Sequence, residues 1–444
     1  MQKHRYTILV VITLLLFSFI LIFAKKPKQQ VAGFKERVGS IALSGEWMDT
    51  KKAIQDLLAA IELNPENYKA KLNLAQAYIQ EARVTGDHGY YDGAALELLE
   101  DVIKHEPKNF DALCCKATVL LSQHHFSDAL IVAKEALPLN PNSAFIYGLM
   151  CDAYVELGNY PEAVKMSDKM ISIRPDIRSY ARVSYLREIH GDLNGAIVAC
   201  KLAVGAGYPG LEQTEWTRMI LAHLYESAGH LDTAEYHYKL ALQERPDYAF
   251  AIAGLGKIEK AKGNYKEAIK YYERAKEMII EYSFADELTD LYHLNSEIEK
   301  EKKSAESVIE MLSPLSNEDE SSSSHGHYAD KELAYAYLKI YDTEKASKHS
   351  LLEYERRPDN IDVCETVAWV NYKKGDYVTA NKMINKALRT NCKNPILLCR
   401  AGLIKIKAGE KEKGIELIKM ALSTNPFITD IELKNEVLKY IVAS

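Results

Sequence analysis

Three histidines are the first candidates for chemistry, because imidazole is a common metal ligand. His223, His230 and His237 recur every seven residues. A metal site would also need carboxylate or cysteine companions at matched spacing, and the sequence offers none. His230 follows Gly229 in an expected turn, and the other two histidines lie on the separate helices before and after it. We therefore predict no metal site and no cofactor.

Motifs for covalent chemistry are missing from the sequence. The Gly254-Leu-Gly256-Lys257 run lies in a helical pattern without a preceding strand, so it is not a phosphate-binding loop. Neither a Gly-X-Ser-X-Gly elbow nor a His-Glu-X-X-His motif occurs. The seven cysteines lack paired C-X-X-C spacing, and those at apolar positions are expected to be buried hydrophobic residues. We predict that the chain is not an enzyme.

One segment keeps an alternative open. Residues 317–327 are acidic and serine-rich and contain His325 and His327. Such a composition cannot form a core, so we expect a solvated loop, although phosphorylation or metal binding are competing interpretations. The atypical stretch 283–327 could also carry hidden chemistry, in which case the chain would be a regulatory subunit or an enzyme.

Composition excludes several classes of protein. The 444 residues are 47% hydrophobic and 27% charged, with a formal net charge of -6. Disordered chains combine low hydrophobicity with a strong charge imbalance, and neither is found here. Nucleic-acid binders are usually basic, so the acidic balance predicts no nucleic-acid partner.

An apolar segment near the N-terminus predicts a membrane anchor. Residues 7–24 carry no charge and are flanked by basic residues on both sides. Eighteen helical residues span roughly 27 Å, which is sufficient for a hydrocarbon core. No small-residue cleavage site or lipid-modified cysteine follows the apolar run. We therefore expect residues 1–28 to form an uncleaved single-pass transmembrane anchor.

The membrane side of the remaining chain follows from the flanking charges. More Lys and Arg residues follow the apolar segment than precede it, which favours a cytoplasmic C-terminal body. An odd number of cysteines without a disulfide pattern points the same way. The bacterial periplasm stays open as an alternative.

Proline and glycine reveal an internal repeat. Pro107, Pro141 and Pro175 are spaced 34 residues apart, and each follows a helical pattern. Between prolines, a glycine recurs with an alanine five residues later, as in Gly263 and Ala268. Glycine can end one helix in the left-handed conformation, alanine lets two helices approach closely, and proline ends the second helix. The repeating unit is therefore a helix-turn-helix.

This pattern resembles the tetratricopeptide repeat (TPR) family. In a unit numbered from Glu215, the family's small or aromatic positions 8, 11, 20, 24 and 27 and its proline at 32 are Ala222, Tyr225, Ala234, Tyr238, Ala241 and Pro246. The resemblance covers about residues 34–428. It implies an all-α fold, a right-handed α-solenoid of about eleven helix-turn-helix units. From the apolar segment we expect one transmembrane helix before the solenoid.

We divide the chain on this basis. Residues 34–282 are predicted to form an N-terminal array, and residues 327–428 a C-terminal array. Residues 283–326 comprise a degenerate repeat, with Asp290 and Lys302 at small-residue positions, followed by the serine-rich loop. Residues 429–444 should form a capping helix.

The resemblance also implies a binding surface. In TPR proteins, the first helices of successive units line a concave groove, with positions 2, 5, 9 and 12 facing it. Those positions here are Phe145, Tyr185, Trp216, Met219, Phe250, Tyr328, Tyr335, Trp369 and Tyr372. The expected function is a membrane-tethered scaffold that binds a peptide or protein partner in this groove. The alternatives are a periplasmic envelope assembly or secretion factor and a regulatory subunit of an enzyme complex.

Overall fold

A computed structural model of the chain describes residues 31–37, 39–42, 45–313 and 327–441. The chain divides into two units, residues 1–35 and residues 36–444, and the fold of the second is described below. The predicted anchor, residues 7–24, lies outside the described residues, as does most of the serine-rich segment. Among the helices that are described, none combines the length and apolar character needed to cross a membrane.

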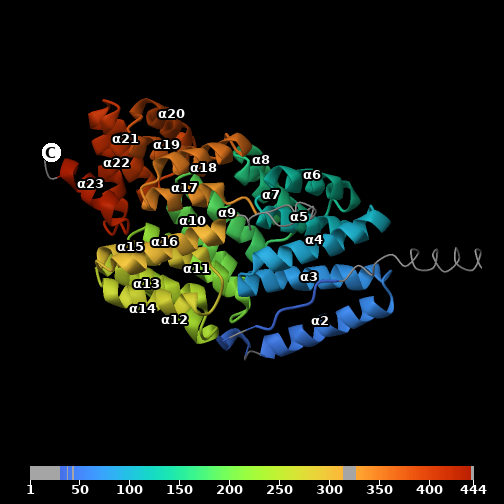
Figure 1. The fold of residues 1–444 in the computed structure, drawn as a ribbon. Coiled ribbons are helices and arrows are strands. Elements are labelled where there is room, and N and C mark those ends of the chain that lie inside the picture. The colour runs from blue at the N-terminus through green and yellow to red at the C-terminus, as the bar shows by residue number, and fades with distance from the viewer. Residues whose placement is uncertain (1–30, 38, 43–44, 314–326, 442–444) are drawn as a thin grey trace, which may run out of the picture. The chain divides into compact units, whose positions relative to one another are not determined.

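The described residues of this unit contain 22 α-helices, a few short 3-10 turns and no strand (Figure 1). In the first half, the helices are α2 (Gly45–Leu63), α3 (Tyr68–Thr85), α4 (His88–His105), α5 (Phe110–Ser122), α6 (Phe126–Ala136), α7 (Ala144–Glu156), α8 (Tyr160–Ile173), α9 (Ile177–Ile189), α10 (Leu193–Gly205), α11 (Glu212–Ser227) and α12 (Leu231–Glu244). In the second half, they are α13 (Ala249–Lys262), α14 (Tyr265–Lys276), α15 (Tyr282–Leu294), α16 (Ile298–Leu312), α17 (Asp330–Lys339), α18 (Thr343–Arg356), α19 (Ile361–Lys374), α20 (Tyr377–Ala387), α21 (Pro395–Lys407), α22 (Lys411–Thr424) and α23 (Ile431–Ile441).

Successive helices pack as pairs, and the pair α13–α14 shows which residues form the turn and allow close packing. Gly263 ends α13 in the left-handed conformation with φ of 84°, which a residue with a Cβ adopts only with strain. On α14, Ala268 is fully buried among the apolar side chains of the pair. On α13, a Cβ at Gly254 would come within 2.3 Å of the Tyr238 ring, so only glycine fits against α12. Small residues therefore set how closely each pair packs on the preceding one.

Ten complete pairs run from α3 to α22 within the described residues. The first unit, predicted from residue 34, contains the short 3-10 turn Gly39–Ala42 and then α2 alone. Residues 282–312, expected to be a degenerate repeat, form the regular pair α15–α16, and Glu281 caps α15 by accepting a hydrogen bond from the Ser283 N–H. Helix α23 packs on α21 and α22 at the C-terminal end. The division into two arrays stays a prediction.

Segments about 200 residues apart meet along a line that we call the seam, formed by residues 85, 123–124, 155–160 and 226 against residues 280, 327–328, 357–361 and 425. The Ile280 N–H donates to the carbonyl of Thr85 (3.2 Å), and the Tyr328 N–H donates to that of Gln123 (3.1 Å). Backbone bonds of this kind require two loops to lie in direct contact. The pairs of helices therefore wind into a superhelix whose second turn lies against the first.

Further hydrogen bonds join the two turns along the seam. Asn360 donates to the carbonyl of Glu156 (3.0 Å), 204 residues away, and Asn425 donates to that of Glu226 (2.9 Å), 199 residues away. The spacing stays near 200 residues because one superhelical turn takes about six repeats of 34 residues.

The seam is also held by a buried arginine. Arg357 donates to Glu353 (2.5 Å) on its own turn and to Glu156 on the other turn. Its guanidinium also lies over the Phe126 ring, 4.7 Å from the centroid. Arg357 and Glu353 are both nearly inaccessible to solvent, and Glu353 pairs with Arg356 as well, so these buried charges are stabilised by a small network of ion pairs.

Candidate functional site

The first helices of the repeats carry charged side chains that pair with one another across the inside of the superhelix. Arg182 of α9 donates to Asp152 of α7 (2.8 Å), and Arg400 of α21 donates to Glu365 of α19 (2.9 Å). Partners in such pairs lie 30 to 35 residues apart, about one repeat, so equivalent positions of neighbouring units face each other. We call this charged lining the inner face.

A cavity of about 470 Å³ opens on the inner face among α13, α15, α17, α19 and α21. This volume is within the range of ligand-binding pockets. Carboxylates dominate the described residues that line it: Asp286, Glu287, Asp290, Glu332, Asp362, Glu365 and Asp430. The basic residues there are Lys260, Lys331, Lys339 and Arg400, and Tyr335 and Thr366 add hydroxyl groups. The cavity is acidic overall.

Two lysines, Lys260 buried and Lys339 partly buried, neutralise part of this charge. Lys260 pairs with Glu287 (2.7 Å) and Asp290 (3.4 Å), and Lys339 pairs with Asp286 and Asp290 (both 2.9 Å). Burial alone would lower the pKa of Lys260, but Glu287 and Asp290 outweigh it and raise that pKa. Both lysines therefore stay charged at neutral pH.

Other carboxylates in the cavity are less well compensated. Burial raises the pKa of Asp286 above its ordinary value, although Lys339 acts against the shift. Burial likewise raises the pKa of Glu365, even with Arg400 beside it. The cavity thus carries negative charge at an energetic cost.

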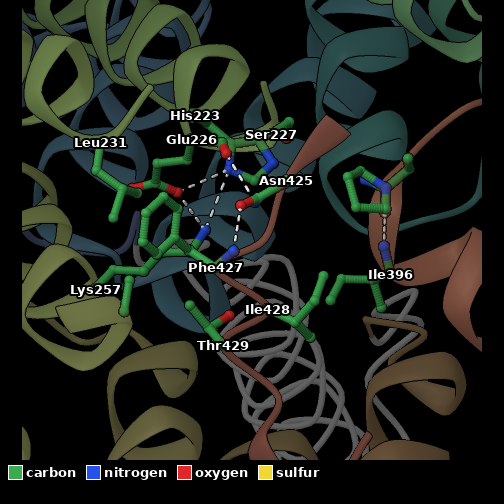
Figure 2. A pocket seen from close by; sticks show the side chains of 13 residues that line it. His223, Glu226, Ser227, Leu231, Lys257, Ile396, Asn425, Phe427, Ile428 and Thr429 are labelled. Carbon is green, nitrogen blue, oxygen red and sulfur yellow. Dashed lines mark hydrogen bonds and ion pairs between the residues drawn. The ribbon is translucent and has the colours of Figure 1, made fainter. Parts of the chain in front are cut away.

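A second, smaller pocket lies where α11 and α13 meet the segment after α22 (Figure 2). His223, Glu226 and Lys257 converge there, with Lys257 2.8 Å from Glu226 and 3.2 Å from His223. Burial would raise the pKa of Glu226, but Lys257 and His223 lower it to about 2. At about 70 Å³ the pocket holds about two water molecules, so it has no room for a peptide.

The three histidines spaced by seven residues have different partners. His223 contacts the Glu226 carboxylate, whereas the His237 ring stacks on Tyr225 (5.5 Å between centroids) and His230 precedes α12. Among the described residues, no three His, Cys, Asp or Glu side chains are arranged to hold a metal ion. All seven cysteines are free, and burial raises the pKa of Cys151 and of Cys200 to about 12.

The nine predicted groove residues fall into three classes of exposure. Tyr185, Trp216 and Tyr328 are exposed, and Phe145, Phe250 and Tyr335 are partly buried. Met219, Trp369 and Tyr372 are buried, although Trp369 still lines a pocket of about 240 Å³ beside Tyr335 and Arg400.

Packing between repeats explains the buried class. Trp369 stacks on Tyr372 with ring centroids 4.9 Å apart, and the Tyr372 hydroxyl donates to Glu436 of α23. The capping helix therefore covers this end of the inner face. Whether a partner contacts any of the nine residues stays a prediction.

Tyr185 shows that the inner face is enclosed. It keeps 38% of its surface accessible, yet burial among surrounding protein raises its pKa well above the ordinary value. Asp362 of α19 and Glu156 of α7 contribute to this shift, so groups from both superhelical turns surround the ring. Residues such as Tyr185 therefore contact solvent inside the superhelix.

Sequence reasoning missed the charged lining of the inner face. The family positions predict aromatic residues on this face, whereas the cavity is built mainly from Asp, Glu, Lys and Arg. A usable signal was present, since Lys260 and Asp290, like Asp152 and Arg182, are opposite charges 30 residues apart. Searching for opposite charges at the repeat spacing would have found them.

Comparisons with known proteins agree with this architecture. A family model described as a tetratricopeptide repeat matches residues 251–279, which cover most of α13 and α14. Human protein O-mannosyl-transferase TMTC1 is 25% identical over 162 residues, which is 35% of this chain and only 18% of that protein.

Solved structures of repeat proteins are similar to this chain at low identity and low TM-score. A thermophilic TPR protein from Thermus thermophilus is 24% identical, covering 40% of this chain and 92% of that one, with a TM-score of 0.36. A tetratricopeptide repeat protein from Parabacteroides merdae is 19% identical, covering 56% of this chain and 93% of that one, with a TM-score of 0.43. The family model thus identifies a tetratricopeptide repeat at residues 251–279, and the other helix pairs repeat the same two-helix arrangement.

Proposed function

We propose that this chain is a membrane-tethered scaffold that binds a segment of a partner protein on its inner face and assembles a membrane-associated complex. The observation that carries the proposal is the cavity of about 470 Å³ built from the first helices of five successive units. A surface assembled from so many repeats suits an extended protein segment, because each repeat adds contacts.

Tethering rests on the sequence of residues 7–24, which are long and apolar enough to span a bilayer. An anchor confines the scaffold to one surface, so even weak contacts act at high effective concentration. The cytoplasmic side is favoured by the flanking charges, and the periplasm is the alternative.

Site-specific photo-crosslinking tests the binding surface. A photoreactive amino acid replaces Tyr185 on the inner face or, as a matched control, Tyr236, which is 59% exposed on α12. We expect one partner to crosslink at Tyr185 and not at Tyr236. Its purified form should bind the chain more weakly after Tyr185→Ala but not after Tyr236→Ala. Equal labelling at both positions would place binding elsewhere.

Protease protection on intact membranes tests the tether and its side. A cytoplasmic body is digested only after the inner membrane is broken, whereas a periplasmic body is digested once the outer barrier is opened. Removing residues 1–28 should release the chain into the soluble fraction. A full-length chain found in that fraction would refute the tether.

A further inference from the structure

The acidic cavity of the inner face has a charge pattern that its own residues do not balance. Among the described residues lining it, seven carboxylates face four basic groups, an excess of three negative charges. Lys260 and Lys339 are each shared between two carboxylates, and Arg400 is bonded to Glu365. These three basic groups therefore already have carboxylate partners within the protein.

Two carboxylates on neighbouring helices have oxygen atoms that are not fully used by protein partners. Asp362 of α19 forms no salt bridge with any described residue and acts on Lys331 only at longer range. Glu332 of α17 lies 3.4 Å from Lys331 through Oε1. Its Oε2 is buried and accepts no hydrogen bond from the described residues. A buried acceptor left without a donor is destabilising unless a ligand or water supplies one.

An unused donor lies in the wall of the same cavity. The Nε atom of Arg400 is buried and donates to no described residue, although Nη1 of the same side chain bonds to Glu365. The unbonded Oε2 of Glu332 lacks a hydrogen-bond donor, and the unbonded Nε of Arg400 lacks an acceptor. A ligand that satisfies both would combine a positively charged donor with an acceptor. Phosphate-bearing ligands fit poorly, because the net charge of the cavity would repel them.

We propose that this cavity binds a basic segment of the partner protein, with a lysine ammonium or arginine guanidinium at Asp362 and Glu332 and a peptide carbonyl accepting from Arg400. This inference rests on the proposed function, since it names the chemistry of the segment that the inner face takes. A free polyamine would supply donors only and would leave Arg400 without an acceptor. A peptide supplies both.

Fluorescence anisotropy with a defined probe tests the proposal. The probe is a labelled hexapeptide of alternating glycine and lysine, and its comparison peptide replaces lysine by glutamate. The full-length chain is kept in a mild nonionic detergent. We expect the lysine peptide to bind and the glutamate peptide not to bind. The double variant Asp362→Asn/Glu332→Gln should weaken binding by roughly tenfold or more, because charge-assisted hydrogen bonds are lost.

A matched variant separates the cavity from general attraction to an acidic protein. Glu412→Gln/Glu416→Gln removes the same charge from exposed positions on α22 and should leave the affinity within about twofold. Equal weakening by both double variants would mean surface adsorption and would overturn the proposal. Failure of the lysine peptide to bind would also overturn it, as would equally tight binding of spermidine with the same dependence on Asp362.

A loss of binding in these variants can be distinguished from a loss of folding. Asp362→Asn removes a carboxylate without a salt-bridge partner. The melting temperature of this variant should therefore equal or exceed that of the parent chain. Glu332→Gln alone gives an independent reading if one variant folds poorly. Partner crosslinking at Tyr185 without lysine-peptide binding would refute this inference and keep the proposed function. Absence of both would refute both.

Discussion

Helix corners in the two superhelical turns have the same sequence pattern but different surroundings. Gly158, between α7 and α8, and Gly375, between α19 and α20, both adopt positive φ, 76° and 85°. A Cβ at Gly158 would come within 2.0 Å of the Asp359 carbonyl oxygen across the seam, whereas a Cβ at Gly375 would meet nothing within 4 Å. Gly375 is needed only for the turn, while Gly158 must also let a second backbone approach.

Other corners repeat this difference. At Gly86 and Gly191, a Cβ would overlap a backbone oxygen 2.0 Å and 2.3 Å away, and around Gly263 and Gly409 the space is open. The same residue type in the same repeat position therefore has two roles, depending on whether another turn lies against it. Contact across the seam should make the first turn less tolerant of substitution than the second.

The largest effect should come from Arg357→Met, which breaks the seam. The change removes one of the two arginines that pair with the buried Glu353, leaving Arg356, and it removes the bond to Glu156 on the other turn. Removing one member of a buried pair costs about 3–5 kcal/mol, measured as the decrease in unfolding free energy in urea. Lys413→Met, which breaks an exposed pair with Glu410, should cost less than about 1 kcal/mol. Equal losses would show that the seam pair contributes no special stability.

Gly158→Ala and Gly375→Ala sharpen the comparison directly. Both variants should lose about 1–2 kcal/mol for a non-glycine residue in the left-handed region. Gly158→Ala should lose about 1–3 kcal/mol more, because its Cβ forces the seam apart. Urea unfolding of the two variants gives the difference. If they are equally stable, the two turns are not in contact at this corner in solution.

Tyr160→Phe should have a smaller effect at the same seam. The Tyr160 hydroxyl accepts a hydrogen bond from the Ile361 N–H (2.9 Å), and both residues are buried. Without the hydroxyl, the N–H loses its partner, at a cost of about 1–3 kcal/mol in unfolding free energy. Tyr236→Phe, at an exposed position, is the control and should be neutral. Amide hydrogen exchange at Ile361 should accelerate, and unchanged protection there would contradict the assignment.

His124→Gln should have the smallest effect at neutral pH, but it should change the response to acid. Burial, with His327 beside it, lowers the pKa of His124 to about 4. The unfolded chain, with an ordinary pKa of 6.5, therefore binds more protons between about pH 6.5 and pH 4, and stability falls as the pH falls through this window. The variant should lose less stability than the parent chain between about pH 7 and pH 5, compared by urea unfolding.

The matched control for this pH experiment is His105→Gln, at an exposed histidine on α4. It should leave the pH dependence of the urea midpoint unchanged. If the pH dependence of stability is the same in His124→Gln as in the parent chain, protonation of His124 does not destabilise the seam.

Much of the repeat architecture could be predicted from the sequence, because its determinants are local. The glycine, alanine and proline spacing sets each helix pair, as Gly263 and Ala268 show in α13 and α14. The seam could not be predicted, since it depends on small rotations accumulated over about six repeats. No short motif identifies Asp359 as the neighbour of Gly158.

The cavity shows a different kind of limit. In the repeat pattern Asp290 is a departure, because a carboxylate stands where a small residue belongs. In the structure, Asp290 is the carboxylate that both Lys260 and Lys339 contact. A residue that violates a local rule often does so for a site, and here the violation marks the cavity wall. The sequence therefore singles out Asp290 as unusual, but the pattern alone is interpreted as degeneration of the repeat instead of a site.

The near-constant spacing across the seam restricts how this chain can evolve. Repeat proteins commonly gain or lose whole units, since each unit contacts only its neighbours. Here the corner at Gly158 faces the loop at Asp359, and Arg357 pairs with Glu156, 201 residues away. Duplicating or deleting one unit between them would shift every one of these contacts by a full repeat. Changes in length should therefore be tolerated only at the ends of the chain or in steps that preserve the register between the turns.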